Sequence, residues 1–187
     1  MFYINYESIK NKIEDFIAKC SELSLEANAT YRGNGLCVAL FNDDGNKGYA
    51  KIRGVNIGLL GCSAADVDGV QLSPVSSSQN MNGVEVGVVN LACYLDGVQL
   101  GVVNGSRSPH GIQAGIANIS LESCDGVQLG AYNTSDTVYG LQLGLVSKAK
   151  GGKYLQLGLL NIREKNPDEK RWYKRFGISP LIGWGNH

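Results

Sequence analysis

Histidine is scarce in this chain, and only His110 lies among residues that could act with it chemically. Ser106 and Ser108 precede it closely, and Asp96 and Asp125 would stand one repeat before it and one repeat after it. A hydroxyl, an imidazole and a carboxylate are the set that a serine hydrolase uses. No segment resembles the nucleophile elbow or the oxyanion hole that this set requires. We interpret His110 as a turn residue and predict no catalytic residues.

Metal and cofactor sites are also poorly supported by the sequence. Asp68, Asp96 and Asp125 share one place in the repeat, but they would stand two coils apart, roughly 9–10 Å at ~4.8 Å per coil, too far to share a calcium ion. The five cysteines lack the paired spacing of a zinc site, and we predict buried free thiols. Gly33 and Gly35 precede a predicted strand, whereas a dinucleotide fingerprint follows one. We predict no metal and no cofactor.

A basic, aromatic segment near the C-terminus could bind nucleic acid. It contains Arg163, Lys165, Lys170, Arg171, Lys174 and Arg175, interleaved with Trp172, Tyr173 and Phe176. Such a segment can follow a phosphate backbone and stack on bases. The same residues could instead cover the end of a sheet, where charges discourage edge pairing. Lysine plus arginine (17) balances aspartate plus glutamate (17) over the chain, so we favour the cap and predict no nucleic-acid partner.

The elements that carry these residues are copies of one eight-residue unit. The copies are GLCVALFN (35–42), GVNIGLLG (54–61), GVQLSPVS (69–76), GVEVGVVN (83–90), GVQLGVVN (97–104), GIQAGIAN (111–118), GVQLGAYN (126–133), GLQLGLVS (140–147) and YLQLGLLN (154–161). A fixed period means that each unit stacks on its neighbours. Counted from the opening residue, the second, fourth and sixth positions are apolar, which is typical of a strand with one face turned inward.

Two polar columns help to choose the architecture. The third position is glutamine or glutamate from Gln71 to Gln156, and the eighth is asparagine in most copies. Identical amides can hydrogen-bond along a parallel in-register stack, whereas an antiparallel meander would scatter them. We therefore predict an all-β fold, a parallel β-solenoid of about nine 14-residue coils. An antiparallel β-barrel is the alternative.

The ends of the chain depart from the repeat. Residues 1–30 are predicted to form an N-terminal α-helical cap, since Ile9, Ile13, Phe16, Ile17 and Cys20 fall on one helical face. The repeats occupy residues 31–161, with an insertion at 43–53 that should project as a hairpin or loop. Residues 162–187 are predicted to form a C-terminal cap in which Trp184 covers the last apolar layer.

The repeated GVQLGVVN unit and the RWYKRFGISPLIG tail resemble the surface-repeat family first named from leptospiral lipoproteins. The resemblance covers about residues 35–161. It implies no catalytic residue, because that family has no established activity. Those proteins usually have export or lipidation signals, and this sequence shows neither. The resemblance therefore does not imply a location at the cell surface.

A column of small residues at the fifth position, mostly glycine, leaves two interpretations open. If it faces outward with the glutamines, the solenoid presents a flat stripe suited to an interface. If the chain bends near the sixth position, glycine relieves crowding at a corner. The candidate interface residues are Gln99, Gly101, Val103, Gln113, Gly115, Gln128, Gly130, Tyr132, Gln142 and Gly144.

The function expected from these features is a non-catalytic structural or binding scaffold, with a protein partner or a second copy of the chain. A polymer-processing hydrolase on the solenoid is an alternative, but the strand face carries only Glu85 as an acid. An outer-membrane barrel is a second alternative, disfavoured by ~8-residue strands. We predict no membrane partner and a cytoplasmic location, the alternative being the cell surface by a route without a signal peptide.

Overall fold

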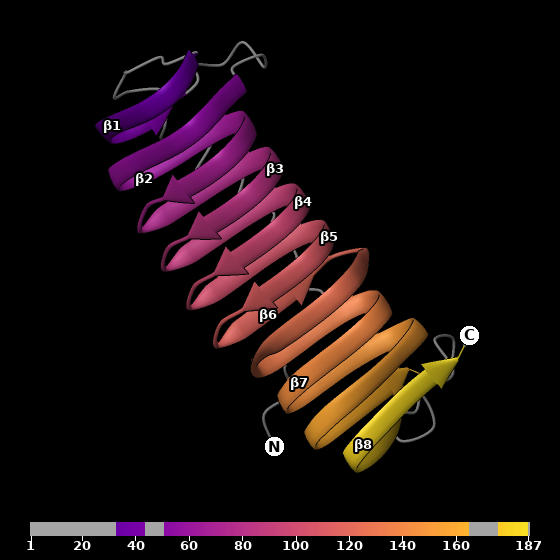
Figure 1. The fold of residues 1–187 in the computed structure, drawn as a ribbon. Coiled ribbons are helices and arrows are strands. Elements are labelled where there is room, and N and C mark those ends of the chain that lie inside the picture. Colours follow the sequence, from indigo (N-terminus) through magenta and orange to yellow (C-terminus); the bar gives the residue numbers. More distant parts are fainter. Residues whose placement is uncertain (1–32, 44–50, 165–175, 187) are drawn as a thin grey trace.

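The chain winds into a stack of β-coils (Figure 1). A computed structural model describes residues 33–43, 51–164 and 176–186, and all described elements are strands. They are β1 (Gly33–Asp43), β2 (Lys51–Leu72), β3 (Val75–Val86), β4 (Val89–Leu100), β5 (Val103–Ala114), β6 (Ala117–Ser120), β7 (Ser123–Glu164) and β8 (Phe176–Asn186). The predicted all-β, parallel β-solenoid is confirmed.

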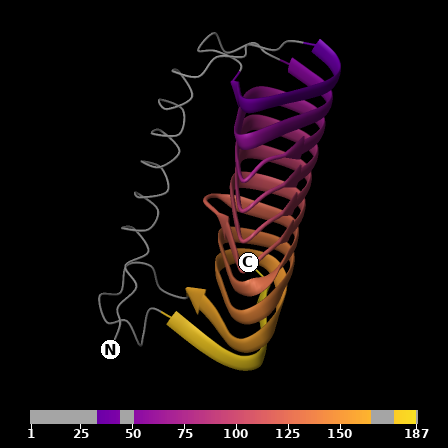
Figure 2. The ribbon, with the colours of Figure 1, turned by 90° about the vertical axis from the view of Figure 1, so that its left-hand side faces the viewer.

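Parallel, in-register pairing joins the coils from β1 to β7. Gly83 pairs with Gly97, which pairs with Gly111, so each residue lies above its counterpart one repeat earlier. Figure 2 shows the coils following one another along a single axis. The alternative of an antiparallel barrel is wrong, because every pairing between β1 and β7 is parallel.

Every copy except the last begins with glycine, and the backbone conformation there requires it. Gly97 has a φ of 143°, in the region that other residues rarely adopt. A Cβ atom there would also collide with the carbonyl oxygen of Gly83 in the preceding coil. The same φ region is occupied by Gly83 and Gly111. The period of the sequence is therefore tied to one sharp bend in each coil.

Apolar side chains of the return strand form the hydrophobic part of the interior. The thirteenth position of the repeat, predicted to face inward, is 2% exposed at Val67, 1% at Met81 and Leu95, and 0% at Val138. Small residues from the same strand join them, as Ala64 and Ala92 do in the larger cluster. The prediction for the thirteenth position is confirmed.

The predicted inward orientation of the second, fourth and sixth positions is wrong. Leu100 is 40% exposed and Val102 is 43% exposed, whereas Gln99, which directly precedes Leu100, is 0% exposed. Alternation fixes which residues share a face, but either face can be the inner one. The polar set goes inside because its amides satisfy one another when stacked, and because the chain bends at the glycine after them.

The C-terminal strand extends the sheet instead of covering its apolar layer. β8 pairs antiparallel with the last part of β7, and Trp184 stands opposite Leu155. Trp184 is 67% exposed, so the predicted covering of the last layer by this side chain is wrong. Directly opposed residues share a face, and Leu155 points outward. The indole therefore points outward as well.

The predicted insertion and the predicted N-terminal cap lie partly or wholly outside the described residues. The insertion predicted at 43–53 is shorter, because β1 ends at Asp43 and β2 begins at Lys51, whose successors Ile52 and Arg53 pair with Gly33 and Asn34. Residues 44–50 between them lie outside the described residues, as do the predicted helical cap at 1–30 and residues 165–175.

The cysteines are predicted to be buried. Cys37, Cys62 and Cys124 are buried, as predicted, and form no disulfide, while Cys93 is half-buried and Cys20 lies outside the described residues. Within the part of the chain that is described, no helix combines the length and the apolar character needed to cross a membrane.

Candidate contact face and buried amide ladders

A ladder of glutamine amides runs through the interior of the solenoid. The Nε2 atom of Gln113 donates to Oε1 of Gln99 at 2.8 Å, and Gln128 donates to Gln113 at 2.9 Å. The ladder continues with Gln142 donating to Gln128 at 2.6 Å and Gln156 to Gln142 at 2.7 Å. Because these amides are at most 1% exposed, each bond replaces one that water would otherwise make.

The direction of this ladder reverses at its N-terminal end. Gln99 donates to Oε2 of Glu85 at 2.7 Å, continuing the direction of the later rungs. Asn56 donates in the opposite sense, to Oε1 of Gln71 at 3.3 Å. Gln71 and Glu85 are register neighbours, and Nε2 of Gln71 and Oε1 of Glu85 have no hydrogen-bond partner. Hydrogen-bond donation from both sides therefore runs toward the neighbouring pair of Gln71 and Glu85.

Glu85 is an ionisable group inside this polar column. Its side chain is fully buried, and burial raises its pKa from the usual 4.5 to about 8, although the hydrogen bond from Gln99 lowers it in part. Removing a carboxylate from water without a positive partner disfavours the charged form. The neutral acid therefore predominates in the folded protein at pH 7.

A second ladder, made of asparagines, lines the corner of each coil. Asn90 donates to Oδ1 of Asn104 and Asn104 to Asn118, both at 2.9 Å, and Asn118 donates to Asn133 at 2.8 Å. The same Nδ2 atoms reach backbone carbonyls, as Asn104 does with Ala114 at 2.9 Å. This ladder runs in the opposite direction to most of the glutamine ladder, and its bonds to backbone carbonyls join the corner of each of these coils to the next coil.

The fifth-position glycines pack against these asparagines, which resolves the two interpretations. A Cβ atom on Gly101 would lie 2.6 Å from Nδ2 of Asn90 and 2.9 Å from Oδ1 of Asn104. Gly115 would meet Nδ2 of Asn104 at 2.8 Å. The column therefore lies at a crowded corner and does not form an outward stripe.

The candidate interface residues accordingly fall into three groups. Gln99, Gln113, Gln128 and Gln142 are 0–1% exposed, so their predicted outward orientation is wrong. The glycines of the set, Gly101, Gly115, Gly130 and Gly144, line the corner described above. Val103 and Tyr132 lie at the start of the return strand and are half-buried. Burial raises the pKa of the Tyr132 hydroxyl, which its hydrogen bond with Thr134 partly offsets.

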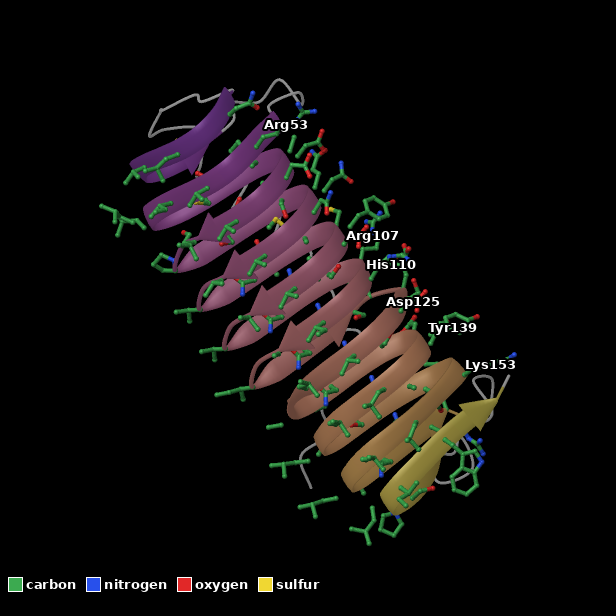
Figure 3. All side chains as sticks on the ribbon, viewed as in Figure 1. Arg53, Arg107, His110, Asp125, Tyr139 and Lys153 are labelled. Carbon is green, nitrogen blue, oxygen red and sulfur yellow. The ribbon has the colours of Figure 1, made fainter. Side chains whose placement is uncertain are left out.

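The outer surface of the same strands is apolar instead. We define the apolar face as the second, fourth and sixth positions of the described coils together with Ile182 and Trp184 of β8. Its most exposed members, from 36% to 67%, are Leu36, Val38, Leu59, Val88, Leu100, Val102, Ile112, Ile116, Leu129, Leu145, Leu155, Leu157, Leu159, Ile182 and Trp184. No charged side chain occupies these positions within the described residues. Figure 3 shows hydrocarbon side chains along the strands.

Polar and charged groups gather along a different edge of the solenoid, at the fourteenth position of the repeat. Figure 3 labels Arg53, His110, Asp125, Tyr139 and Lys153 along this polar edge. Nε2 of His110 lies 4.0 Å from Asp125, and both side chains are about 60% exposed. An exposed pair at this distance contributes little to stability.

Ser106 and His110, considered above as a nucleophile and its base, lie in different surroundings, while Ser108 is half-buried. His110 does stand between Asp96 and Asp125 in register, as the repeat predicts. Ser106, however, is 3% exposed and belongs to the interior, whereas His110 is exposed on the polar edge. A nucleophile and its base must lie within hydrogen-bond reach, and opposite orientations prevent this.

A small cavity and no cluster of metal ligands are found among the described residues. A cavity of about 110 Å³ between the last coil and β8 is lined by Gln156, Asn161, Arg163 and Trp184 among others. Ligand sites are usually several times larger, about 300–1,000 Å³. No group of three or more histidine, cysteine, aspartate or glutamate side chains could hold a metal ion in those residues.

The apolar face was the feature that sequence reasoning missed, because its residues were assigned to the core. One signal could have found it. Hydrogen-bonded amide columns are worth most where water is excluded, so the glutamines belonged inside and their neighbours Leu100 and Val98 outside. The second, fourth and sixth positions, which carry no charged residue, then form an apolar outer surface.

Comparisons with protein-family models, with curated proteins and with solved structures found no match to this chain. The resemblance to the surface-repeat family stays a prediction.

Proposed function

We propose that this chain is a non-catalytic repeat scaffold that makes protein–protein or self-association contacts through its apolar face. The observation that carries this proposal is the row of exposed apolar side chains that continues from Leu36 in β1 to Trp184 in β8 without a charged residue. Soluble proteins scatter single apolar residues over their surfaces, but a contiguous patch usually marks an interaction site.

The size of the face supports a contact role. Its columns span four residue steps, about 13 Å, and its strands follow one another over roughly 43 Å at ~4.8 Å per strand. The resulting rectangle of roughly 550 Å² lies at the upper end of the largest patches found on ordinary monomers. Water contact along this face is unfavourable, and association would remove it.

Finer features of the architecture belong to the same proposal. We infer about nine coils, an N-terminal helical cap at residues 1–30 and a C-terminal cap at 162–187. The pairing of β8 with Lys153–Glu164 supports the C-terminal cap, since it occupies backbone groups at that edge. The apolar periodicity between Ile9 and Cys20 supports the helix.

Carbene footprinting of the full chain tests the contact role. The reagent is photoactivated in dilute purified protein, in concentrated protein and in an extract of cells that produce it, and labelling is read at Leu100 and Ile112. Tyr94 and Tyr139, which are 53% and 49% exposed outside the apolar face, serve as controls. We expect the two face residues to become protected in concentrated protein or in the extract, while both tyrosines stay labelled. Full labelling of the face residues under all three conditions would contradict the proposal.

A further inference from the structure

The apolar face continues beyond the repeats onto a strand that is not one of them. β8 runs antiparallel to the last coil, and its register places Trp184 opposite Leu155 and Ile182 opposite Leu157. The two β8 side chains are 67% and 51% exposed. A strand that only terminated the stack could present polar residues on its outer side. Here it adds an aromatic side chain of the kind that dominates binding at interfaces.

The charge distribution limits what can cover this face. The face itself has no charged residue, and the polar edge carries both signs, such as Arg53 beside Asp68 at 3.8 Å. A nucleic acid or an acidic peptide would find no complementary field along the face. Its occupant must therefore be apolar, flat and about as long as the face.

A second copy of this chain has each of these properties, and we propose that two copies pack apolar face against apolar face. This inference rests on the contact role proposed above. Both surfaces would have the same length and the same strand spacing, as a two-fold interface requires. Two rectangles of roughly 550 Å² together bury about 1,100 Å², which reaches the roughly 1,000 Å² expected of a specific interface.

The packing is that of two β-sheets in a sandwich. Side chains from facing sheets interdigitate in a layer about 10 Å thick. In the fourth-position column the small Ala114 lies between Leu100 and Leu129, so a hollow lies between two ridges at the strand spacing. The polar edges remain in water at the rim, where charged residues of an interface are usually found.

Light scattering of the purified full chain tests this inference. The wild type should have a mass of twice 20.0 kDa at concentrations from about 1 to about 100 µM. The face variant replaces two outward side chains, each 40% exposed, by lysine: Leu100→Lys with Ile112→Lys. Each lysine would be buried without a partner, so the dissociation constant should rise roughly 100-fold or more. The matched control is Tyr94→Lys with Tyr139→Lys, which adds the same charge outside the face and should stay dimeric.

The possible results separate this inference from the proposed function. Circular dichroism first establishes that both variants are folded. A wild-type monomer whose face takes up an apolar fluorescent dye, with uptake lost in the face variant, would overturn the second copy as partner and leave an accessible contact face. A wild-type monomer without dye uptake would overturn both. A face variant that remains dimeric would show that copies meet through another surface, which overturns the second copy as occupant of the apolar face and leaves a different protein partner there possible.

Discussion

Replacing Glu85 by glutamine should remove a pH dependence of stability that the wild type carries. Glu85 is 0% exposed within a column of amides, and burial raises its pKa from 4.5 to about 8. Glutamine has nearly the same shape and no charge. In the variant, the side-chain amides of Gln71 and Asn56 can rotate by half a turn. All hydrogen bonds of the ladder would then be donated in one direction.

The sign follows from proton binding in the two states. The unfolded chain loses the Glu85 proton near pH 4.5 and the folded chain near pH 8, so the folded state holds more protons between these values. Stability from this group is fully present below pH 4.5, falls as the pH rises and is lost above pH 8. The two pKa values differ by about 3.5, and at about 1.4 kcal/mol each this amounts to about 5 kcal/mol.

Urea unfolding of both proteins at pH 5, 7 and 9 measures this effect. About 4 kcal/mol of the wild-type free energy of unfolding should disappear between pH 5 and pH 9, whereas Glu85→Gln should change little. Cys124, whose burial raises its pKa to about 11, titrates above this range. Glu122→Gln is the matched control, because Glu122 is exposed beside Arg107, and it should keep the wild-type pH dependence.

Parallel pH curves for wild type and Glu85→Gln would refute the reasoning. They would mean that Glu85 ionises at the same pH in the folded and unfolded chains, and hence that its carboxyl group is hydrated. The buried ladder could not then be correct at that rung.

Four further substitutions, of which Val102→Ala is a control for Gly101→Ala, test other contacts by urea unfolding. Gly101→Ala should lower the free energy of unfolding by about 2 kcal/mol, because its methyl group meets two asparagine amides, while Val102→Ala on the outer side should cost about 1 kcal/mol or less. Gln128→Leu should cost about 2–4 kcal/mol, since it leaves a donor and an acceptor of neighbouring rungs unpaired. Lys150→Ala should cost less than about 1 kcal/mol, because its ion pair with Asp136 is part-exposed. Equal effects at Gly101 and Val102, a neutral Gln128→Leu, or a large loss at Lys150 would each contradict the corresponding contact.

The repeat period and the polar columns were sufficient to predict the architecture. Stacked glutamines such as Gln99 and Gln113 need parallel strands in register, and this constraint distinguishes a solenoid from an antiparallel barrel. The bend at Gly97 and the buried thirteenth position also follow from local patterns. Each of these features depends on contacts between residues one repeat apart, and the repeat spacing can be read directly from the sequence.

The orientation of the strand could not be predicted from alternation alone. Apolar residues at Leu100 and Val102 alternate with Gln99 and Gly101 in a way that is compatible with either face inside. Hydrophobicity favours the first set as core, but the two amide ladders and the corner glycine favour the second. The ladders determine which face is buried, because their amides form hydrogen bonds with the amides one repeat before and one repeat after them. This stabilisation arises between repeats and is not visible in the sequence of any single one.

The arrangement of β8 was only partly predictable. A final strand after the charged segment is consistent with its apolar residues, but its antiparallel direction depends on how the chain returns from Glu164. That direction places Trp184 on the outside, opposite an exposed leucine. A covering role for Trp184 assumed that the leucine was inside.

Side-chain amide exchange tests the central claim, that amides lie inside and apolar columns outside, most directly. Two-dimensional NMR spectra of the labelled full chain are recorded after transfer into D2O, and the NH2 signals of Gln99, Gln113, Gln128 and Gln142 are followed. Buried, hydrogen-bonded amides should persist long after the signals of exposed side chains such as Gln79 and Asn82 have disappeared. Loss of the four ladder signals as quickly as those of the exposed amides would contradict the account.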